Sequence, residues 1–249
     1  MLIDAHIHLD QYKEEDVPKL LEEAQFVIAV STDLQSCEKT LTLSNLFTKV
    51  KAAYGFHPEQ SLPSDHDKQA LFNWIRLHAE DMVAIGEVGL PYYRKQAQVL
   101  DERPYIELLD QFIQLAKELH KPIVLHAVYE DALIACDLLE RHAVTKAHFH
   151  WFKGSEEAIE RMIHNGYFIS ITPDCVYEAE IQTLIKSYPL ELMMVETDGP
   201  WPFEGPFENA RTSPCMMAKT IDVIASLKGI TVQEAGQKVT ENTKLFYEI

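Results

Sequence analysis

The chain opens with Leu2-Ile-Asp-Ala-His-Ile-His8, a short β-rich run in which two histidines alternate with apolar residues. Similar short apolar runs recur at regular intervals, and segments of helical periodicity separate them. The eight predicted strands are residues 2–8, 26–30, 52–56, 82–88, 122–126, 146–150, 167–171 and 192–197. Eight alternating strand and helix units in 249 residues predict a (β/α)8 TIM barrel, in a somewhat distorted form. No G-x-G-x-x-G motif follows a strand, which argues against a dinucleotide-binding sheet.

The last part of the chain is expected to be helical. One helix is predicted between Ser213-Pro214 and Gly229, and a second follows the capping-box pattern Thr231-Val-Gln-Glu234. The Pro- and Gly-rich residues 199–206 directly follow the eighth strand and predict a loop over the barrel mouth. Because we find no internal repeat, low-complexity tract or linker, we expect one domain over residues 1–249.

Composition restricts the function before any motif is considered. The chain has 22 basic and 39 acidic residues, a net charge of -17, which argues against a broad nucleic-acid-binding face. Its four cysteines form no C-x-x-C pair. No secretory n-region precedes the first apolar stretch. No apolar run approaches the ~20 residues that a membrane span requires. These features predict a cytoplasmic protein without membrane insertion. No coiled-coil pattern stands out, so a monomer is the default expectation.

Ionisable residues end several predicted strands. Strand alternation places Asp4, His6 and His8 on one face, although an isolated H-x-H is more often a pair of hydrogen-bonded core histidines. Four other predicted strands also end in an ionisable residue, which favours a functional site over a pair of core histidines. Barrel active sites lie at these strand ends. In addition, burying an unpaired ionisable group costs free energy. The six convergent residues are His6, His8, Glu87, His126, His150 and Asp198. Imidazole and carboxylate together suit one or two divalent ions such as Zn, Mn, Mg, Co or Ni, and Glu87 could bridge two of them.

The ionisable residues and the motifs around them resemble those of a known family, the TatD-like metal-dependent hydrolases of the amidohydrolase superfamily. The matching motifs are Asp4-Ala-His-Ile-His-Leu-Asp10, Gly55-Phe-His-Pro58, Ala84-Ile-Gly-Glu-Val-Gly-Leu90, Leu125-His126, His150-Trp-Phe-Lys-Gly154, Glu196-Thr-Asp-Gly-Pro200 and Asn242-Thr-Lys-Leu-Phe246. The resemblance covers nearly the whole chain. It implies a distorted TIM barrel, a site for one or two metal ions and hydrolysis of phosphodiesters, with DNase activity as the best-known assignment.

The resemblance also assigns roles to individual residues. It implies that His6, His8 and Asp198 hold one ion, that His126 and His150 hold the other, and that Glu87 bridges the two. A divalent ion lowers the pKa of its bound water and so supplies a nucleophile near neutral pH. Asp198 is then the candidate general base, and Glu87 is a catalytic residue through its bridging position.

Substrate residues are less sharply indicated. The candidates are His57, Tyr92, Arg94, Lys153 and Arg211, where aromatic rings could stack on a base and cations could meet phosphate. For each of them a structural or solvated loop position is the alternative. His148 is expected to be structural, Glu196 to support Asp198, and Cys175 to be a buried inert thiol.

The sequence departs from the family pattern where substrate would be selected. Pro91 replaces an Asp after strand four, Val128 replaces an Arg after strand five, and Trp151 and Lys153 replace small residues after strand six. Three classes of function remain. They are a phosphodiesterase acting on DNA or on small phosphodiesters, a hydrolase of another ester, lactone or amide, and a metal-binding protein without enzymatic activity.

Overall fold

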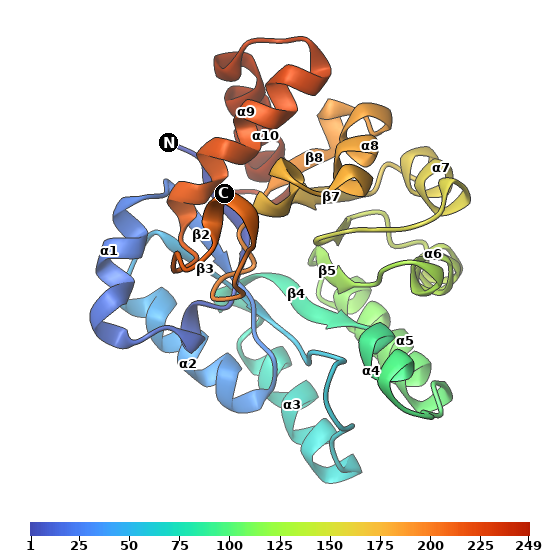
Figure 1. Ribbon diagram of the computed structural model, residues 1–249. Helices are drawn as coiled ribbons and strands as arrows, with labels where there is room; N and C mark the ends of the chain where they lie inside the picture. The colour runs from blue at the N-terminus through green and yellow to red at the C-terminus, as the bar shows by residue number, and fades with distance from the viewer.

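The computed structural model describes all 249 residues and contains one parallel sheet whose eight strands follow their order in the chain (Figure 1). The strands are β1 Ile3–Ile7, β2 Phe26–Ala29, β3 Val50–Tyr54, β4 Met82–Gly89, β5 Ile123–His126, β6 Ala147–Phe149, β7 Phe168–Ile171 and β8 Met193–Val195. The predicted eight-stranded (β/α)8 barrel is therefore confirmed. The third strand was predicted at residues 52–56 and lies two residues earlier, because buried Phe56 extends the apolar run beyond the strand.

Ten α-helices surround the strands. They are α1 Val17–Glu22, α2 Leu34–Leu46, α3 Asp65–Leu77, α4 Tyr92–Ala97, α5 Arg103–Glu118, α6 Glu130–His142, α7 Glu156–His164, α8 Ala179–Ser187, α9 Met217–Lys228 and α10 Val232–Tyr247. The predicted capping box is present at the start of α10, where Thr231 and Glu234 satisfy each other's backbone N–H groups. Gly229 ends α9 in the left-handed conformation that glycine adopts readily.

The barrel is irregular, as predicted. Register shifts interrupt the pairing of β1 with β2, of β3 with β4 and of β4 with β5. Two hydrogen bonds join the region of β1 to the segment that follows β8: Asp198 N–H donates to His6 O (3.0 Å) and His8 N–H donates to Gly199 O (2.8 Å). The Asp4 carboxylate accepts hydrogen bonds from the N–H and hydroxyl of Thr197. These contacts hold the ends of the first and last strands together.

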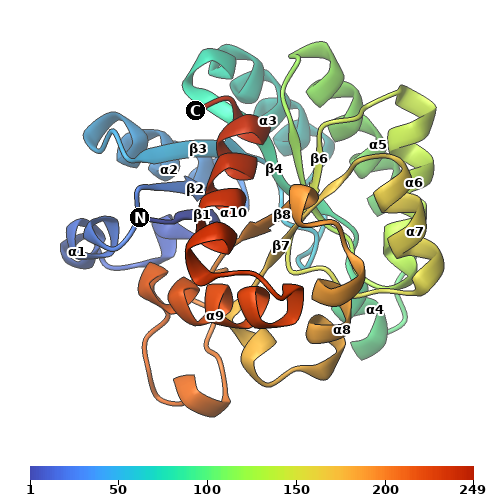
Figure 2. The same ribbon diagram turned by 90° about the horizontal axis from the view of Figure 1, so that it is seen from above.

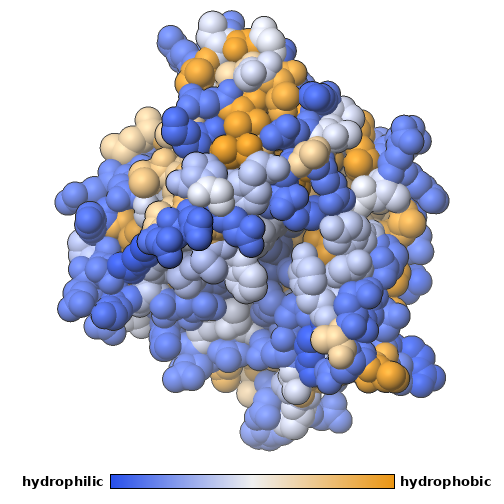
Figure 3. Space-filling view, viewed as in Figure 1, coloured by the Kyte–Doolittle hydropathy of each residue, from blue (hydrophilic) through white to orange (hydrophobic).

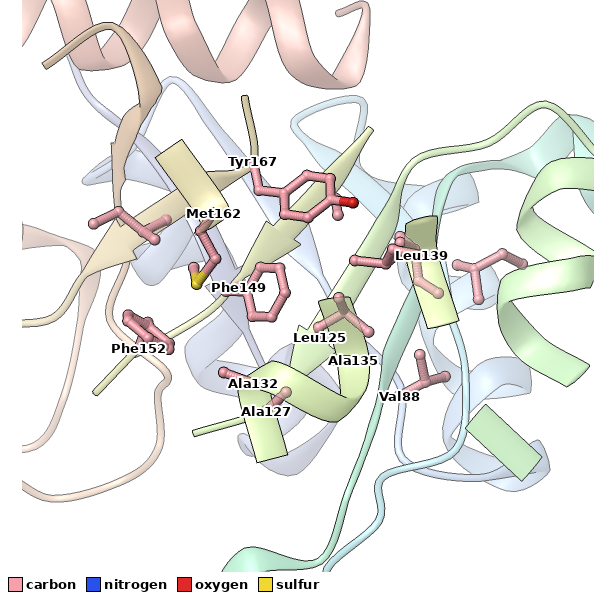
Figure 4. Close-up of a cluster of buried hydrophobic side chains, with 14 of the residues drawn as sticks. Val88, Leu125, Ala127, Ala132, Ala135, Leu139, Phe149, Phe152, Met162 and Tyr167 are labelled. Carbon is pink, nitrogen blue, oxygen red and sulfur yellow. The ribbon is translucent and has the colours of Figure 1, made fainter. Parts of the chain in front are cut away.

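Apolar side chains fill the space between the strands and the outer helices. Figure 4 shows part of this layer, where Leu125 and Phe149 of neighbouring strands lie beside Ala135 and Leu139 of α6. Phe246 and Tyr247 of α10 belong to a buried apolar cluster with residues of six strands, and Figure 2 shows α10 lying across the strands. The carboxyl ends of the strands are thus left for a site.

The surface is largely polar on the face shown in Figure 3, where hydrophobic residues form small separate groups. None of the helices combines the length and the apolar character required to span a bilayer.

Candidate metal centre

Glu87, near the end of β4, occupies the centre of the cluster, and its two carboxylate oxygens face different groups. Oε2 lies 3.2 Å from His6 Nε2 and 3.3 Å from His8 Nε2. Asp198 completes this side, because its Oδ1 lies 3.3 Å from the same nitrogen of each histidine. Two imidazoles and two carboxylates therefore converge on one point.

The other oxygen of Glu87 faces a second group of imidazoles. Oε1 lies 3.1 Å from His126 Nδ1 and 2.7 Å from His150 Nε2, and these two nitrogens are 3.2 Å apart. His57 Nε2 is a further 3.4 Å neighbour of Oε1. The structure therefore brings all six sequence-predicted ligands together and places Glu87 between the two groups, the arrangement that a bridging carboxylate requires.

Several buried polar atoms of this cluster have no hydrogen-bond partner. Both Glu87 oxygens, His6 Nε2 and Asp198 Oδ1 are buried and none of them makes a hydrogen bond. Buried carboxylate and imidazole groups normally find partners, because leaving them unpaired costs free energy. Lone pairs that face one another without hydrogen bonds are what metal coordination uses. The residues therefore fit one or two divalent ions, with His6, His8 and Asp198 on one side of Glu87 and His126 and His150 on the other.

The electrostatics of the site keep its carboxylates ionised. Burial opposes ionisation of Glu87, but nearby His57, His150 and His6 outweigh it and hold its pKa well below the ordinary value. Burial likewise opposes ionisation of Asp198, whereas its contacts with His6 and His8 lower its pKa. Conversely, burial disfavours the charged form of His8, but Asp198 and Glu87 together raise its pKa to about 10.

Two carboxylates outside the ligand set support the second group of histidines. Glu59 Oε1 lies 3.3 Å from His126 Nε2, the ring nitrogen that faces away from Glu87. Glu59 is in turn fixed by the backbone N–H groups of Tyr93 and Arg94 at the start of α4. Glu59 was not among the predicted site residues, although it directly follows the matched motif Gly55-Phe-His-Pro58. Such contacts orient a ligating imidazole and set which nitrogen carries the proton.

Glu196 takes the corresponding position at His150. Its Oε1 accepts the Trp151 N–H and lies 3.6 Å from His150 Nδ1, and its Oε2 accepts the Ser170 hydroxyl. The expectation that Glu196 supports Asp198 is therefore wrong, because the carboxylate of Glu196 is directed toward the β6 and β7 side. His148 lies behind it, within 2.5 Å of Ser170 Oγ and 2.7 Å of the Tyr247 hydroxyl.

A pocket of about 600 Å³ opens above the cluster. His8, His57, His126, His150 and Asp198 form its polar part together with Glu59, and Tyr93, Val128, Trp151 and Trp201 supply its walls. The predicted loop at 199–206 reaches the mouth, where Pro200, Trp201 and Pro202 line the pocket. Asp198 begins this loop with a φ of +48°, a left-handed conformation that is uncommon outside glycine and that recurs at functional sites.

His57 lines the pocket as expected, whereas the other four predicted substrate residues do not. Tyr92 packs on Tyr129 with ring centroids 4.8 Å apart. The Arg94 guanidinium donates to the Tyr105 hydroxyl, and Arg211 pairs with Asp16 at 2.7 Å.

Lys153 completes this set and is also directed elsewhere, since its Nζ lies 3.7 Å from Asp174 Oδ2. In the short helix α4 it is Tyr93 and not Tyr92 that lines the pocket, and the two rings lie 5.3 Å apart at 87°. Cys175 is buried as predicted, and burial raises its thiol pKa to about 12, which leaves it unreactive at neutral pH.

A barrel with convergent imidazole and carboxylate groups at the carboxyl ends of its strands has the arrangement of a metal-dependent hydrolase. The family model for TatD related DNase matches residues 3–248, so the chain belongs to the TatD family. An uncharacterized metal-dependent hydrolase from Haemophilus influenzae is 41% identical, with the whole of both chains covered. Human Deoxyribonuclease TATDN3 is 30% identical over 98% of this chain and 94% of the relative.

Solved structures agree with this assignment. The crystal structure of YJJV, a TatD homolog from Escherichia coli, superposes with a TM-score of 0.85 at 25% identity, covering 100% of this chain and 98% of the other. The phosphotriesterase homology protein from Escherichia coli shares the fold with a TM-score of 0.74 at 13% identity, covering 99% and 98% of the two chains. The protein is therefore a metal-dependent hydrolase of the TatD family.

Proposed function

We propose that the protein is a divalent-metal-dependent phosphodiesterase. The observation that carries the proposal is the position of Glu87, whose two oxygens face two separate groups of imidazoles within 3.4 Å. Bound divalent ions would lower the pKa of coordinated water and neutralise charge on the phosphoryl oxygens. The human relative, Deoxyribonuclease TATDN3, is named for a reaction of the same class.

The residues of the chain have distinct tasks in this proposal. Asp198 borders the pocket and is ionised at neutral pH, because His6 and His8 lower its pKa, so it can accept the proton of the attacking water. His57 Nδ1 accepts the Glu59 N–H (3.2 Å), which leaves the proton of a neutral ring on Nε2, directed toward the cluster. Burial lowers the His57 pKa and keeps this ring neutral, so His57 can donate a hydrogen bond to a substrate oxygen.

A second candidate is a hydrolase of an uncharged ester, lactone or amide. It is favoured by one observation, that no Lys or Arg lines the pocket. The same residues would serve, since an activated water attacks a carbonyl carbon as well as phosphorus.

Substitution of Asp198 tests the proposal. We expect Asp198→Asn to lower kcat on bis-p-nitrophenyl phosphate by about 10²- to 10⁴-fold, the usual contribution of a general base, while the protein still binds metal. Asp65→Asn on the exposed start of α3 is the matched control. Metal-loaded wild type that cleaves lactones or amides but no phosphodiester would replace the proposal with the second candidate. Unchanged kcat in Asp198→Asn would remove Asp198 from the mechanism.

A further inference from the structure

The wall of the pocket contains no positive charge. The cations that follow β4, β6 and β8 are already paired: Lys95 with Asp131 and Glu102, Lys153 with Asp174, and Arg211 with Asp16. Arg94 is bound to the Tyr105 hydroxyl. Two carboxylates, Glu59 and Asp198, line the pocket instead. Attraction to a polyanion depends on neutralising phosphates with Lys and Arg, so this pocket is poorly suited to a polynucleotide.

Aromatic side chains take the place of the missing cations. Among all Phe, Tyr and Trp residues of the chain, Tyr93 (52%) and Trp201 (59%) are the exposed ones, and both line the pocket. Tyr93 lies after β4 and Trp201 lies after β8, on opposite sides of the barrel. Exposed aromatic rings cost solvation free energy, and their collection at one pocket is typical of a binding site for a planar group.

A third ring, that of Trp151, is held in place by the surrounding structure. Its indole N–H donates to Asp174 Oδ2 (2.6 Å), its backbone N–H donates to Glu196, and its φ of +37° is in the left-handed region. Asp174 is itself buried and accepts the Thr172 hydroxyl. The rings of Trp151 and Trp201 lie 6.2 Å apart at 72°. A bulky residue kept in a costly conformation by two hydrogen bonds is typical of a functional position.

We propose that Tyr93, Trp151 and Trp201 form a subsite for a planar aromatic group of a small phosphodiester that carries a single negative charge. This proposal rests on the proposed phosphodiesterase function. The metal centre would receive the one charge, the aromatic rings receive the base of a nucleoside ester, and the acidic pocket disfavours the further phosphates of a polynucleotide.

Two esters that share a leaving group test the subsite. Thymidine 5′-(p-nitrophenyl phosphate) and ethyl p-nitrophenyl phosphate both carry one charge and release p-nitrophenolate, and they differ in the nucleoside, which supplies the base on its deoxyribose in one and is replaced by an ethyl group in the other. With metal-loaded wild type we expect kcat/KM to favour the thymidine ester by roughly tenfold or more, within the range that aromatic stacking supplies per base. We expect this preference to fall at least about fivefold in Trp201→Ala and in Tyr93→Ala. Leu77→Ala, an exposed apolar residue at the end of α3, is the control and should keep the wild-type preference.

Equal kcat/KM for the two esters in wild type, or a preference that neither substitution reduces, would overturn the subsite. A second measurement compares the KM of an oligothymidylate of about 20 nucleotides with the KM of the thymidine ester. If the oligothymidylate has a KM more than about tenfold lower, the pocket does not exclude polynucleotides.

Binding separates failure of the subsite from failure of the phosphodiesterase function. Calorimetric titration with thymidine 5′-monophosphate and with ethyl phosphate needs no catalysis. One outcome would keep the subsite and reject the proposed function. In it, neither ester is hydrolysed, thymidine monophosphate binds roughly tenfold more tightly than ethyl phosphate, and Trp201→Ala abolishes this difference in affinity. Equal binding of the two monophosphates removes the subsite.

Discussion

The floor and the rim of the pocket are built from different kinds of side chain. The floor consists of imidazoles and carboxylates that lie on strands or directly after them, and their backbone is fixed by the barrel. The rim consists of Tyr93 in the short helix α4 and of Trp151 and Trp201 in the segments after β6 and β8, where Lys153 and Arg211 pair with Asp174 and Asp16. The difference shows a division of labour in which the strands determine the reaction and the loops determine the substrate.

The largest effect is expected at the centre of the floor. Glu87→Gln removes the negative charge shared by both groups of histidines, so we expect kcat/KM to fall about 10³-fold or more, the equivalent of several kcal/mol of transition-state stabilisation. Metal content measured by mass spectrometry should fall in parallel. Glu80→Gln on the surface is the control, and a Glu87→Gln protein that retained full activity would show that the floor does not carry the reaction.

Metal affinity should depend on pH because protons compete for the same nitrogens. Asp198 and Glu87 raise the His8 pKa to about 10 against the effect of burial, so the metal-free site holds a proton there throughout the neutral range. Glu87 and Asp198 have lowered pKa values and are already ionised, so they release none. Burial opposes the charged forms of His126 and His150, but Glu59 and Glu87 raise the pKa of His126, and Glu87 and Glu196 raise that of His150. Metal binding must displace at least the His8 proton, so affinity should fall at least about tenfold for each pH unit on going from pH 8 to pH 6. A metal titration whose affinity stays constant over this range would contradict the assignment of His8 as a ligand.

A smaller effect is expected one contact away from the ligands. Glu196→Gln keeps the shape of the side chain but weakens its attraction for the His150 ring, 3.6 Å away. Outer contacts of this kind are typically worth about 10- to 100-fold in metal affinity or activity, so we expect a loss in that range. Metal dissociation constants measured at one pH test it, with Glu191→Gln, an exposed residue before β8, as the control. A loss as large as that of Glu87→Gln would place Glu196 among the ligands themselves.

The same division explains what could be predicted from the sequence. Each ligand ends an apolar strand, where an ionisable residue stands out and where barrel geometry makes the strand ends converge, so the sequence predicts the floor. Loop residues follow no such periodicity. Glu59 reaches His126 because the segment after β3 folds against the start of α4. Arg94 donates a hydrogen bond to Tyr105, which belongs to another helix. These tertiary pairings have no local signal, which is why Tyr92, Arg94 and Arg211 were expected at the substrate.

The smallest effect is expected from a substitution that places a positively charged side chain at the rim. Val128 lines the pocket two residues beyond His126, and an Arg there would bring a positive charge toward substrate phosphates. Each added contact with a phosphate of a single strand makes the slope of log affinity against log salt concentration steeper by about 0.7. Val128→Arg should therefore bind oligothymidylate several-fold more tightly than wild type at low salt, and its slope should be steeper by about that amount. Val128→Met, which adds length without charge, should leave the slope as in wild type, and the melting temperatures of both variants report whether the pocket still folds. If Val128→Arg binds no better although it folds and holds metal, the acidic charge around the rim, rather than the missing cation, keeps polynucleotides out.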